Sequence, residues 1–392
     1  MSIYFVGIDI AKYKHNCCII SSSDQSIVSS FAFSNDKIGF NQFLSSVQSL
    51  KEQREIRIGF ESTAHYTLNL KLFLEKANHS FMEVHPILIN EFQKSTTLRR
   101  TKTDIVDSEA IARWLMSVEY KPLSKGFYHS YSLKSLTRLR DRLVRQRSFY
   151  IVKITNVLDH TFPEFKSFFN DKFSKTAIYL LENYGSAEKM ARMKSTSYEK
   201  LRSVSRGKFS PQQFLELKKL ATDTVGVNNH IFDMELISLL RLYQNLDEEI
   251  NLLENEIKVL IRSIDPHFMT IPGIGEISAA VIYAEYGDIS NFSSPNQMLA
   301  FAGLEPSIRE SGEQKNNRGK MVKRGSSYLR YTILNCCLPL IQYNLTFATY
   351  YAKKRAEGKN HMVAQSHVAK KLIRVIFALE RQKVDFEPTL LR

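Results

Sequence analysis

The first 116 residues alternate between short apolar runs and amphipathic stretches, and this order restricts the chain to few folds. Apolar and β-branched side chains predict strands at 3–9, 15–21, 27–33, 56–60 and 81–84. Helical spacing predicts helices at 39–50, 66–77, 87–97 and 104–116. Three strands, a helix, a strand, a helix, a strand and further helices are typical of an open α/β sheet.

Acidic residues occupy comparable places in this pattern. Asp9 terminates the first predicted strand, and Glu61 follows the fourth. Asp104 and Asp107 open the last helix, where a spacing of three places both on one face. Each acid alone is also an ordinary strand end or helix cap. Because neighbouring strand ends meet at one edge of an open sheet, we expect the four carboxylates to converge there.

Four converging carboxylates repel one another unless a cation lies between them. Ligands that are all oxygen atoms suit Mg²⁺ or Mn²⁺. Two such ions about 4 Å apart are a common device for cleaving phosphodiesters. The acids are therefore candidate catalytic residues and candidate metal ligands.

The overall charge indicates the class of partner. The net charge is +14 and the isoelectric point is about 9.4, which favours a polyanion such as nucleic acid over a membrane surface. No apolar run reaches the roughly 20 residues of a membrane helix, and MSIYFVGIDIAK lacks the features of a signal peptide. The cysteines form two adjacent pairs without zinc or redox spacing, Cys17–Cys18 and Cys336–Cys337. We expect buried thiols in a cytoplasmic protein without membrane contact.

Two long helices are predicted beyond a linker at 118–130. The first, at 133–160, contains an apolar stripe and five arginines that favour a phosphate-facing surface, namely Arg138, Arg140, Arg142, Arg145 and Arg147. The second, at 231–264, has leucines and isoleucines at coiled-coil-like spacing. It could pair with the first helix or with another subunit. Phenylalanines between 160 and 230 suggest a small helical core.

Two stretches near the C-terminus are rich in glycine. In 269–292, Pro272, Gly273 and Gly275 predict a helix-hairpin-helix element that could bind phosphate, or a simple packing corner. The stretch 299–330 is turn-rich and basic, which makes it a phosphate-binding surface by charge. Ser311 lies within it. A loop serine is most often a turn former, and no base stands beside it in sequence.

Two sets of motifs resemble the DEDD transposases of the insertion-sequence-110 family. The first set is VGIDIAK with Asp9, GFEST with Glu61, and RRTKTDIVDSEAIA with Asp104 and Asp107. The second is IPGIG at 271–275 and AGLEP…SG…RG…KRG across 302–325. The resemblance implies an α/β RNase H-like domain, similar to the Holliday-junction resolvase RuvC, at 1–125. It further implies an α-helical coiled-coil middle at 126–265 and a mainly α C-terminal transposase domain at 266–392, which contains the helix-hairpin-helix-like element.

The resemblance also implies an activity. Family members are recombinases guided by a structured bridge RNA that pairs with donor and target DNA. Ser311, the serine of the SG motif, would be the nucleophile, and the four acids would hold Mg²⁺. The active site would be composite, because the serine and the acids lie far apart in sequence. The protein would form a homodimer or tetramer and would be associated with the bacterial nucleoid. Expected nucleic-acid contacts are Arg99, Arg100, Lys102, Arg138, Arg142, Arg145, Gly273, Gly275, Arg318, Lys320, Lys323 and Arg324.

Two other functions remain open from the sequence. In a metal-only RuvC-like nuclease or junction resolvase, the acids would cleave DNA and Ser311 would be a turn residue. In an inactive element protein, the basic surfaces would bind RNA or DNA without any chemistry.

Overall fold

The computed structural model describes residues 3–50, 55–62, 66–96, 103–122, 127–306, 310–311, 314–315 and 321–388. Side chains at 104, 127–130, 310–311 and 314–315 are outside this description. The chain divides into two compact units, Met1–His129 and Ser130–Arg392, which we call the first and second units.

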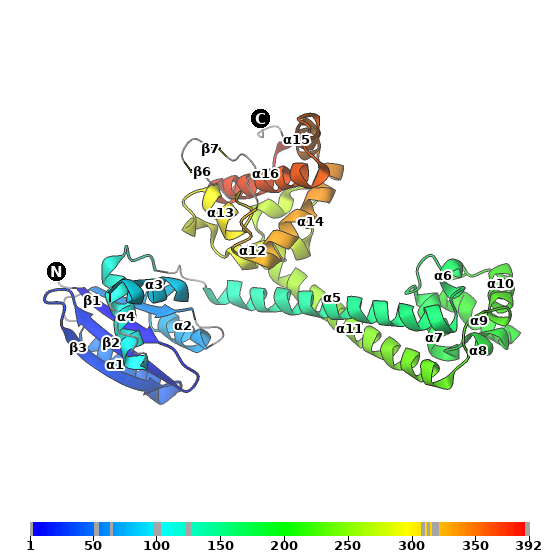
Figure 1. The fold of residues 1–392 in the computed structure, drawn as a ribbon, viewed down its shortest axis with the longest axis horizontal. Helices are drawn as coiled ribbons and strands as arrows, with labels where there is room; N and C mark the ends of the chain where they lie inside the picture. Colours follow the sequence, from blue (N-terminus) through cyan, green and yellow to red (C-terminus); the bar gives the residue numbers. More distant parts are fainter. Residues whose placement is uncertain are drawn as a thin grey trace. The chain divides into compact units, whose positions relative to one another are not determined.

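The described part of the first unit is a five-stranded sheet covered by helices (Figure 1). The strands are β1 (Ile3–Asp9), β2 (Lys14–Ser21), β3 (Ile27–Ser34), β4 (Glu55–Glu61) and β5 (Phe81–Val84). The helices are α1 (Lys37–Gln48), α2 (Thr67–Lys76), α3 (Pro86–Thr96) and α4 (Asp104–Ser117). The predicted α/β order is confirmed, and every element lies close to its predicted bounds.

The sheet has the strand order β3-β2-β1-β4-β5. β1 is antiparallel to β2 and parallel to β4, which is in turn parallel to β5. Because side chains alternate along a strand, β1 contributes to two cores. Val6 and Ile8 pack with residues of α1 and α2 on one face, whereas Phe5 packs with Ile111 and Leu115 of α4 on the other.

The second unit is mostly helical in its described part. It begins within α5 (Phe127–Thr161) and continues with α6 (Phe165–Phe168), α7 (Lys175–Tyr184), α8 (Ala187–Ala191), α9 (Ser195–Val204), α10 (Pro211–Thr222) and α11 (His230–Ile264). It ends with η1 (His267–Thr270), α12 (Glu276–Tyr286), η2 (Ile289–Asn291), α13 (Pro295–Phe301), β6 (Glu310–Ser311), β7 (Gln314–Lys315), α14 (Ser327–Tyr343), α15 (Leu345–Ala356) and α16 (His361–Gln382).

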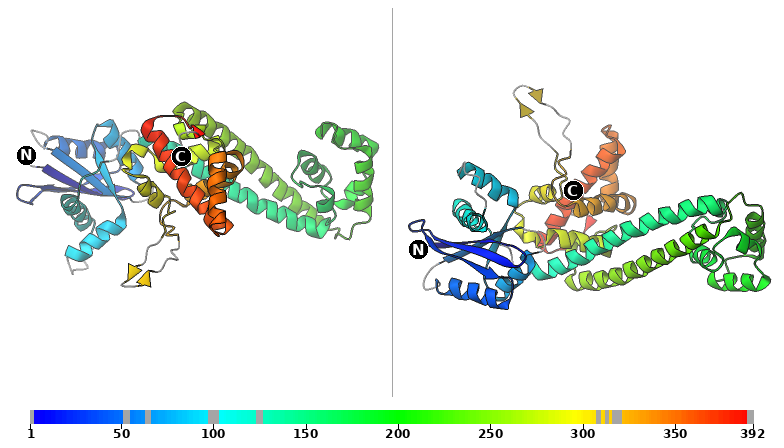
Figure 2. Two further views of the ribbon diagram at one scale, coloured as in Figure 1. Left: turned by 90° about the horizontal axis from the view of Figure 1, so that it is seen from above. Right: turned by 60° about the horizontal axis from the view of Figure 1, so that its bottom comes forward.

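The two long helices, α5 and α11, lie side by side in opposite directions (Figures 1 and 2). Arg140 of α5 forms an ion pair of 2.5 Å with Glu254 of α11, and Arg147 pairs with Asp247. Because the partner numbers fall as the α5 numbers rise, the helices are antiparallel. The pairing within the chain, one of two predicted alternatives, is thus observed. Coiled-coil packing and an additional pairing with another subunit stay predictions.

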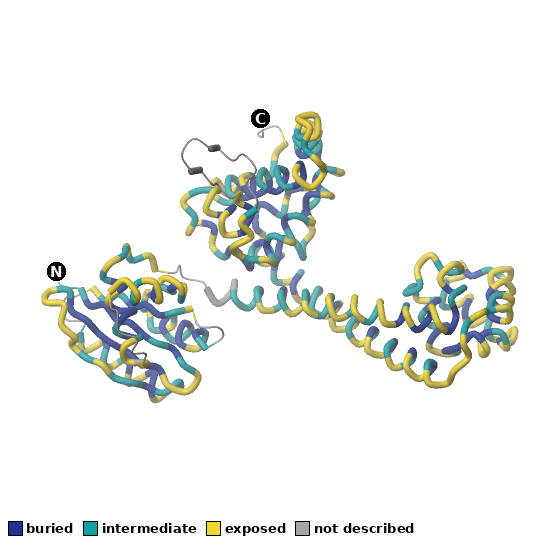
Figure 3. Tube along the Cα trace, in the orientation of Figure 1, coloured by how far each residue is buried: buried dark blue, intermediate teal, exposed yellow. Residues whose placement is uncertain are grey.

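Two separate cores form in the second unit. Phe162, Phe165 and Leu180 belong to a core that joins α6–α10 to the adjoining ends of α5 and α11. A second core joins α12–α16 and includes Ile257 of α11 and Ile373 of α16. Figure 3 shows fewer buried residues along the middle of α5 and α11 than in these two cores. The small helical core predicted from the phenylalanines is therefore present.

One local prediction was wrong. Helix α5 begins at Phe127, within the predicted linker. No proline or glycine lies between Gly126 and the predicted start of the helix, so no residue in this stretch prevents the helix from starting earlier. The helix-hairpin-helix element stays a prediction: the helical segment before Gly273 is the four-residue 3-10 helix η1, and α12 follows the turn. Pro266 and Pro272 bracket η1 and restrict it to a single turn, because proline is not tolerated in a helix interior.

The cysteines are all buried and free, as predicted. Burial raises the pKa of Cys18 to about 11, so this thiol stays protonated at neutral pH. Among the described residues, no helix combines the length and apolar character needed to cross a membrane.

Candidate active site

The ends of β1 and β4 bring two of the predicted acids side by side. These strands are parallel neighbours, and Ile8 pairs with Phe60. Asp9 and Glu61 are the next residues on the two strands, and both strands end there. The convergence expected at this sheet edge is therefore observed for these two backbone positions.

Both acids share the sheet face that α4 covers. Two residues before each acid the strand has a glycine, Gly7 or Gly59. A Cβ on Gly59 would lie 2.8 Å from the side chain of Leu115, so α4 packs directly over the glycine. Because side chains alternate across a sheet, the acid two residues later points to the same face as its glycine.

Helix α4 places its first turn toward these strand ends. A Cβ on Gly7 would lie 2.3 Å from the carbonyl oxygen of Ser108. Farther along α4, Leu115 shares a core with Phe5, which precedes Gly7 on β1. The helix therefore runs back along β1, and its N-terminal turn, with Asp107, lies on the side of Asp9.

The N-terminus of α4 is fixed by its own cap and by a neighbouring helix. The Thr103 hydroxyl accepts a hydrogen bond of 3.4 Å from the Val106 N–H, which starts the helix at Asp104. The Asp107 carboxylate accepts a hydrogen bond of 2.9 Å from Nε2 of Gln93 in α3. Gln93 was not predicted, because one polar residue on a helix gives no local sign of the carboxylate it contacts.

Asn16 is a second residue that the sequence did not reveal. It is the register partner of Asp9 in the antiparallel pair of β1 and β2. Asn16 lies two residues before Cys18 on β2, and Cys18 packs against Ala112 of α4. Because side chains two residues apart share a face of the sheet, the Asn16 side chain lies on the same face as the acids. Only 7% of Asn16 is exposed. A buried amide beside an acid could position it, and the β1–β2 register is the signal that would have shown this.

The donor set fits a hard divalent cation in its chemistry, because every predicted ligand is a carboxylate oxygen. Among the described residues, no group of three or more histidine, cysteine, aspartate or glutamate side chains is placed to hold a metal ion. The side chain of Asp104 is outside that description. The Mg²⁺ site stays a prediction.

The contact between β1 and α4 leads to a test of stability. We expect Gly7→Ala to destabilise the first unit by about 3 kcal/mol, since the new methyl group would meet backbone atoms of Ser108 and Ala112 at 2.3 and 2.4 Å. Gly59→Ala meets only the end of the Leu115 side chain, which can turn aside, and should cost about 1 kcal/mol. The single tryptophan, Trp114 of α4, reports unfolding of this unit by fluorescence. Equal effects of the two variants would contradict the packing described.

Ser311 lies in the second unit, on a short hairpin. The structure describes its backbone in β6, where it pairs with Gln314 of β7. At the base of the loop, Pro306 and Met321 form an isolated bridge. The N–H of Val322 donates to the Glu305 carbonyl at 3.0 Å, which holds the two ends of the loop together. The serine is thus presented on a segment closed at its base.

Two glycines close this base. Gly303 and Gly325 have φ of +66° and +111°, values that side chains rarely adopt. A Cβ on Gly325 would lie 2.1 Å from the Phe301 carbonyl oxygen, and one on Gly303 would lie 2.3 Å from that of Arg324. Gly303 and Gly325, two glycines of the predicted basic loop, therefore serve its closure.

The basic residues among the predicted nucleic-acid contacts fall into three groups. Lys323 and Arg324 are exposed where the loop rejoins the body, and Arg142 is exposed on α5. Arg138 and Arg145 form ion pairs with carboxylates of the protein at 2.7 Å. Outside the described residues lie Arg99, Arg100, Lys102, Arg318 and Lys320. A contact of any of these residues with nucleic acid stays a prediction.

The two glycines of the IPGIG motif differ in their surroundings. A Cβ on Gly273, which has φ of +107°, would lie 3.1 Å from the backbone nitrogen of Leu340 in α14. This glycine therefore allows close packing of α14. Gly275 precedes α12, and a Cβ there would meet no atom within 4 Å. Of the two, only Gly275 faces open space that a phosphate could approach.

Arg138 belongs to an ionic cluster around the buried carboxylate of Glu285 in α12. Its Nε and Nη2 donate to the two carboxylate oxygens of Glu285 at 2.7 and 3.0 Å. Ser326 donates to the same carboxylate at 2.8 Å, and Lys134 lies 3.5 Å from it. Ser326 also caps α14, directly after the Ser311 loop. Glu285 thus joins α5 and α12 to the end of that loop.

Comparisons with known proteins place the chain among related sequences. Residues 6–163 match the family model of IS110-type DEDD transposases, and residues 265–352 match that of the transposase IS116/IS110/IS902 family. The chain is 23% identical to the insertion element IS116 uncharacterized 44.8 kDa protein of Streptomyces clavuligerus, over 98% of this chain and 96% of that protein. It is 24% identical to the transposase for insertion sequence element IS1328 of Yersinia enterocolitica, over 98% and 99%. It is 21% identical to the pilin gene-inverting protein of Moraxella bovis, over 99% and 98%.

The two family matches occur in the order that the motifs require. The first covers Asp9, Glu61, Asp104 and Asp107, and the second covers Ser311. The relatives align along nearly the whole length of the chain. The chain therefore belongs to the IS110/IS116/IS902 family of insertion-sequence transposases.

Proposed function

We propose that this transposase cuts and rejoins DNA through a covalent serine–DNA intermediate, with Mg²⁺ held by four acids and with a guide RNA selecting the DNA. The observation that supports this most is the position of Asp9 and Glu61. They end two adjacent parallel strands on the face covered by α4, whose first turn contains Asp107.

The four acids would form the metal site. Asp9, Glu61, Asp104 and Asp107 would provide oxygen ligands, and the hydrogen bond from Gln93 would hold Asp107 in one orientation. Bound Mg²⁺ would polarise the scissile phosphate and neutralise the charge that develops on it. If the carboxylates converge, a bound cation is needed to offset the repulsion between their like charges.

Ser311 would supply the nucleophile. Its hydroxyl oxygen would bond to the scissile phosphorus and lose its proton, while the bond from phosphorus to one sugar oxygen breaks. That sugar oxygen would leave as a hydroxyl after taking up a proton. One phosphodiester replaces another, so the reverse attack by a DNA hydroxyl can rejoin strands without a nucleotide cofactor. The acids and the serine lie in different units, so the reaction would require both units, from one copy or from two.

The nucleic-acid partners follow from charge and from the family. A net charge of +14 supports binding of polyanions. A structured bridge RNA, as the resemblance implies, would pair with donor and target DNA. One relative is named for inverting a pilin gene, and inversion of a gene requires rejoining as well as cutting. This favours a recombinase over a metal-only nuclease or an inactive binding protein.

The decisive experiment is a search for the covalent adduct. The chain would be expressed with its native flanking DNA, and cells would be lysed in strong detergent. DNA that remains attached to the protein would be sequenced, and RNA from a parallel native purification would be sequenced too. We expect adducts at the ends of the element from the wild type, none from Ser311→Ala, and a transcript from the non-coding end.

Each rival predicts a different result from the same experiment. Metal-dependent cutting by Ser311→Ala at the wild-type rate, with no adduct from the wild type, would establish the metal-only nuclease. Recovery of RNA or DNA without any cutting would establish a binding protein. Ser293→Ala, on an exposed turn before α13, is the matched control for substitution of a serine and should form adducts normally.

A further inference from the structure

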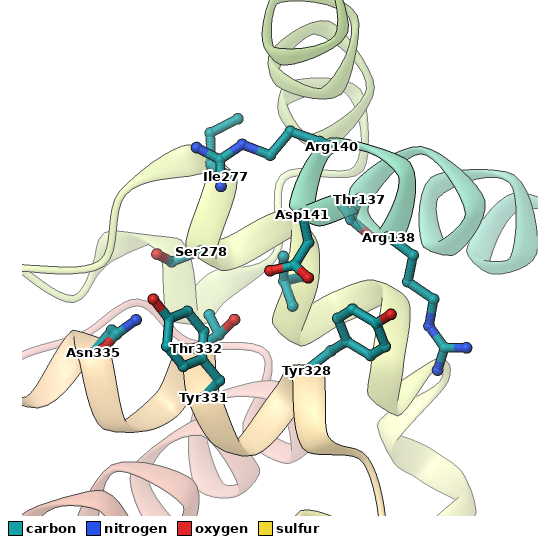
Figure 4. A pocket seen from close by; sticks show the side chains of 11 residues that line it. Thr137, Arg138, Arg140, Asp141, Ile277, Ser278, Tyr328, Tyr331, Thr332 and Asn335 are labelled. Atoms are coloured by element: carbon teal, nitrogen blue, oxygen red, sulfur yellow. The ribbon is translucent and has the colours of Figure 1, made fainter. Parts of the chain in front are cut away.

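A pocket of about 100 Å³ opens between α5, α12 and α14 in the second unit (Figure 4). The proposed reaction assigns it no role. Tyr328 and Tyr331 of α14 line it together with Asp141 of α5, and Figure 4 shows both rings and the carboxylate facing the same space. Thr332 and Asn335 complete its α14 wall.

The tyrosine rings provide flat surfaces at an accessible place. Tyr331 is 58% exposed, so much of its ring is open to a ligand that approaches from solvent. The Arg138 guanidinium lies 4.9 Å from the centre of the Tyr328 ring, so this ring is held by a cation–π contact. One ring is therefore fixed and the other is open to stacking.

The polar groups of the α14 wall have unused hydrogen-bonding capacity. Within the described part of the chain, the side chains of Tyr328, Tyr331, Thr332 and Asn335 form no hydrogen bond with another protein group, and Tyr331 and Asn335 are exposed to solvent. Aromatic walls with a few free donors and acceptors are typical of sites for planar polar ligands. The amide of Asn335 can donate and accept at once, as recognition of a base edge requires.

The charges of the pocket disfavour a phosphate inside it. Arg138 and Arg140 are neutralised by Glu285 and Glu254. The Asp141 carboxylate lines the pocket and is neutralised by Arg145, whose Nε donates to it at 2.7 Å, so the interior offers no net positive charge to a phosphate. At the rim, the Arg145 side chain is 68% exposed, and its other N–H groups can reach an anion outside the pocket. The interior thus suits a neutral ligand that donates hydrogen bonds, and the rim suits an anion attached to it.

The volume limits the size of the ligand. A cavity of about 150 Å³ admits benzene, so a pocket of about 100 Å³ open to solvent admits the edge of a single ring. A purine base, which has two fused rings, would leave much of its area outside the pocket. The sugar and phosphate of a nucleotide would remain at the rim.

We propose that this pocket binds one unpaired pyrimidine base of a nucleic-acid strand, stacked on Tyr331, with the adjoining phosphate near Arg145. Its polar edge contacts Asn335 and Asp141. The inference rests on the proposed function only in that the chain binds nucleic acid. Because duplex DNA keeps its bases stacked, the ligand is a single-stranded or looped segment of RNA or DNA.

Binding of short oligonucleotides to the full chain tests the proposal. Fluorescence anisotropy would compare oligo(dT), oligo(U), oligo(dA) and a duplex, and iodinated pyrimidines would be photocrosslinked and mapped by mass spectrometry. We expect Tyr331→Ala to weaken oligo(dT) or oligo(U) binding about ten-fold, because it removes the stacking of one base. Tyr331→Phe should bind nearly as the wild type, and Asn335→Ala should lose the preference for pyrimidines.

The controls separate this site from other causes. Tyr343→Ala changes a tyrosine of the same helix that is 69% exposed outside the pocket, and it should bind as the wild type does. The stronger of the oligo(dT) and oligo(U) responses identifies DNA or RNA as the source of the base. Wild-type affinity in both Tyr331→Ala and Asn335→Ala, or crosslinks that map away from α14, would overturn the proposal. Adduct formation by the wild type would then still support the proposed function.

Discussion

Asp9→Asn is expected to lower the rate of DNA cleavage about a thousand-fold, the scale of losing a key electrostatic contact in a transition state. Asp9 ends β1 beside Glu61, on the face that α4 covers. Asparagine keeps the size and polarity of the side chain but removes the negative charge that would hold a divalent cation. Cleavage of DNA that contains the element ends, with Mg²⁺ supplied, measures the effect.

Stability should not fall together with activity. Removing one of several converging carboxylates relieves repulsion, so the Trp114 unfolding transition of Asp9→Asn should occur at the same or a higher temperature. Asp24→Asn alters an exposed aspartate in the turn between β2 and β3 and should leave cleavage unchanged. Wild-type cleavage by Asp9→Asn would remove Asp9 from the metal site, whereas loss of activity through unfolding would show in the fluorescence.

Glu285→Ala should destabilise the second unit by about 3 kcal/mol, the lower end of the cost of breaking a buried ion pair. The carboxylate is almost fully buried, and its loss leaves Arg138, Lys134 and Ser326 without their shared partner. The cost stays at the lower end because the two cations are partly exposed and water can reach them. Far-UV circular dichroism reports mainly the second unit, which contains most of the described helical residues, while Trp114 fluorescence reports the first.

The expected signature is a shift in one unfolding transition only. The helical transition of Glu285→Ala should move to lower denaturant concentration, and the Trp114 transition should not. Glu256→Ala removes an exposed glutamate of α11 and should move neither. A parallel shift of both signals would show that the two units unfold together.

The Glu285 carboxylate should make the stability of the second unit depend on pH. Burial opposes its ionisation, but the hydrogen bonds from Arg138 and Ser326 and the charge of Lys134 outweigh it, so the pKa of Glu285 lies below its usual range. A lowered pKa in the folded state stabilises the fold above the unfolded pKa of about 4.3. This contribution is lost as the pH falls through the folded value. The stability difference between the wild type and Glu285→Gln should therefore shrink below about pH 4.

The order of elements in the first unit was predictable because each strand and helix is signalled locally. Asp9 and Glu61 could be assigned to one sheet edge from topology alone, since each of them ends a strand. The shared face could also have been predicted, because Gly7 and Gly59 precede the acids by two residues each. The contact of Gln93 with Asp107 depends on how α3 packs against α4, which no short stretch of sequence specifies.

The arginines of α5 show that a local sequence pattern does not predict ion-pair partners that are distant in the chain. The sequence favoured a phosphate-facing surface, yet Arg138, Arg140 and Arg147 pair with carboxylates that lie 147, 114 and 100 residues away. A run of positive charge does not reveal partners at such separations. The pocket beside Tyr331 is hidden for the same reason, because its walls come from three helices that are distant in sequence.

The antiparallel pairing of α5 and α11 has a consequence for how the length of this protein can vary. Each helix has 35 residues and spans about 50 Å. The Arg140–Glu254 and Arg147–Asp247 pairs lie seven residues apart on both helices, so deleting one matched heptad from each would preserve the remaining register. An insertion in one helix alone would misalign every pair beyond it. The α5–α11 pair therefore fixes the spacing between the two cores of the second unit. Related chains could change this spacing only by matched changes in both helices, in steps of about 10 Å.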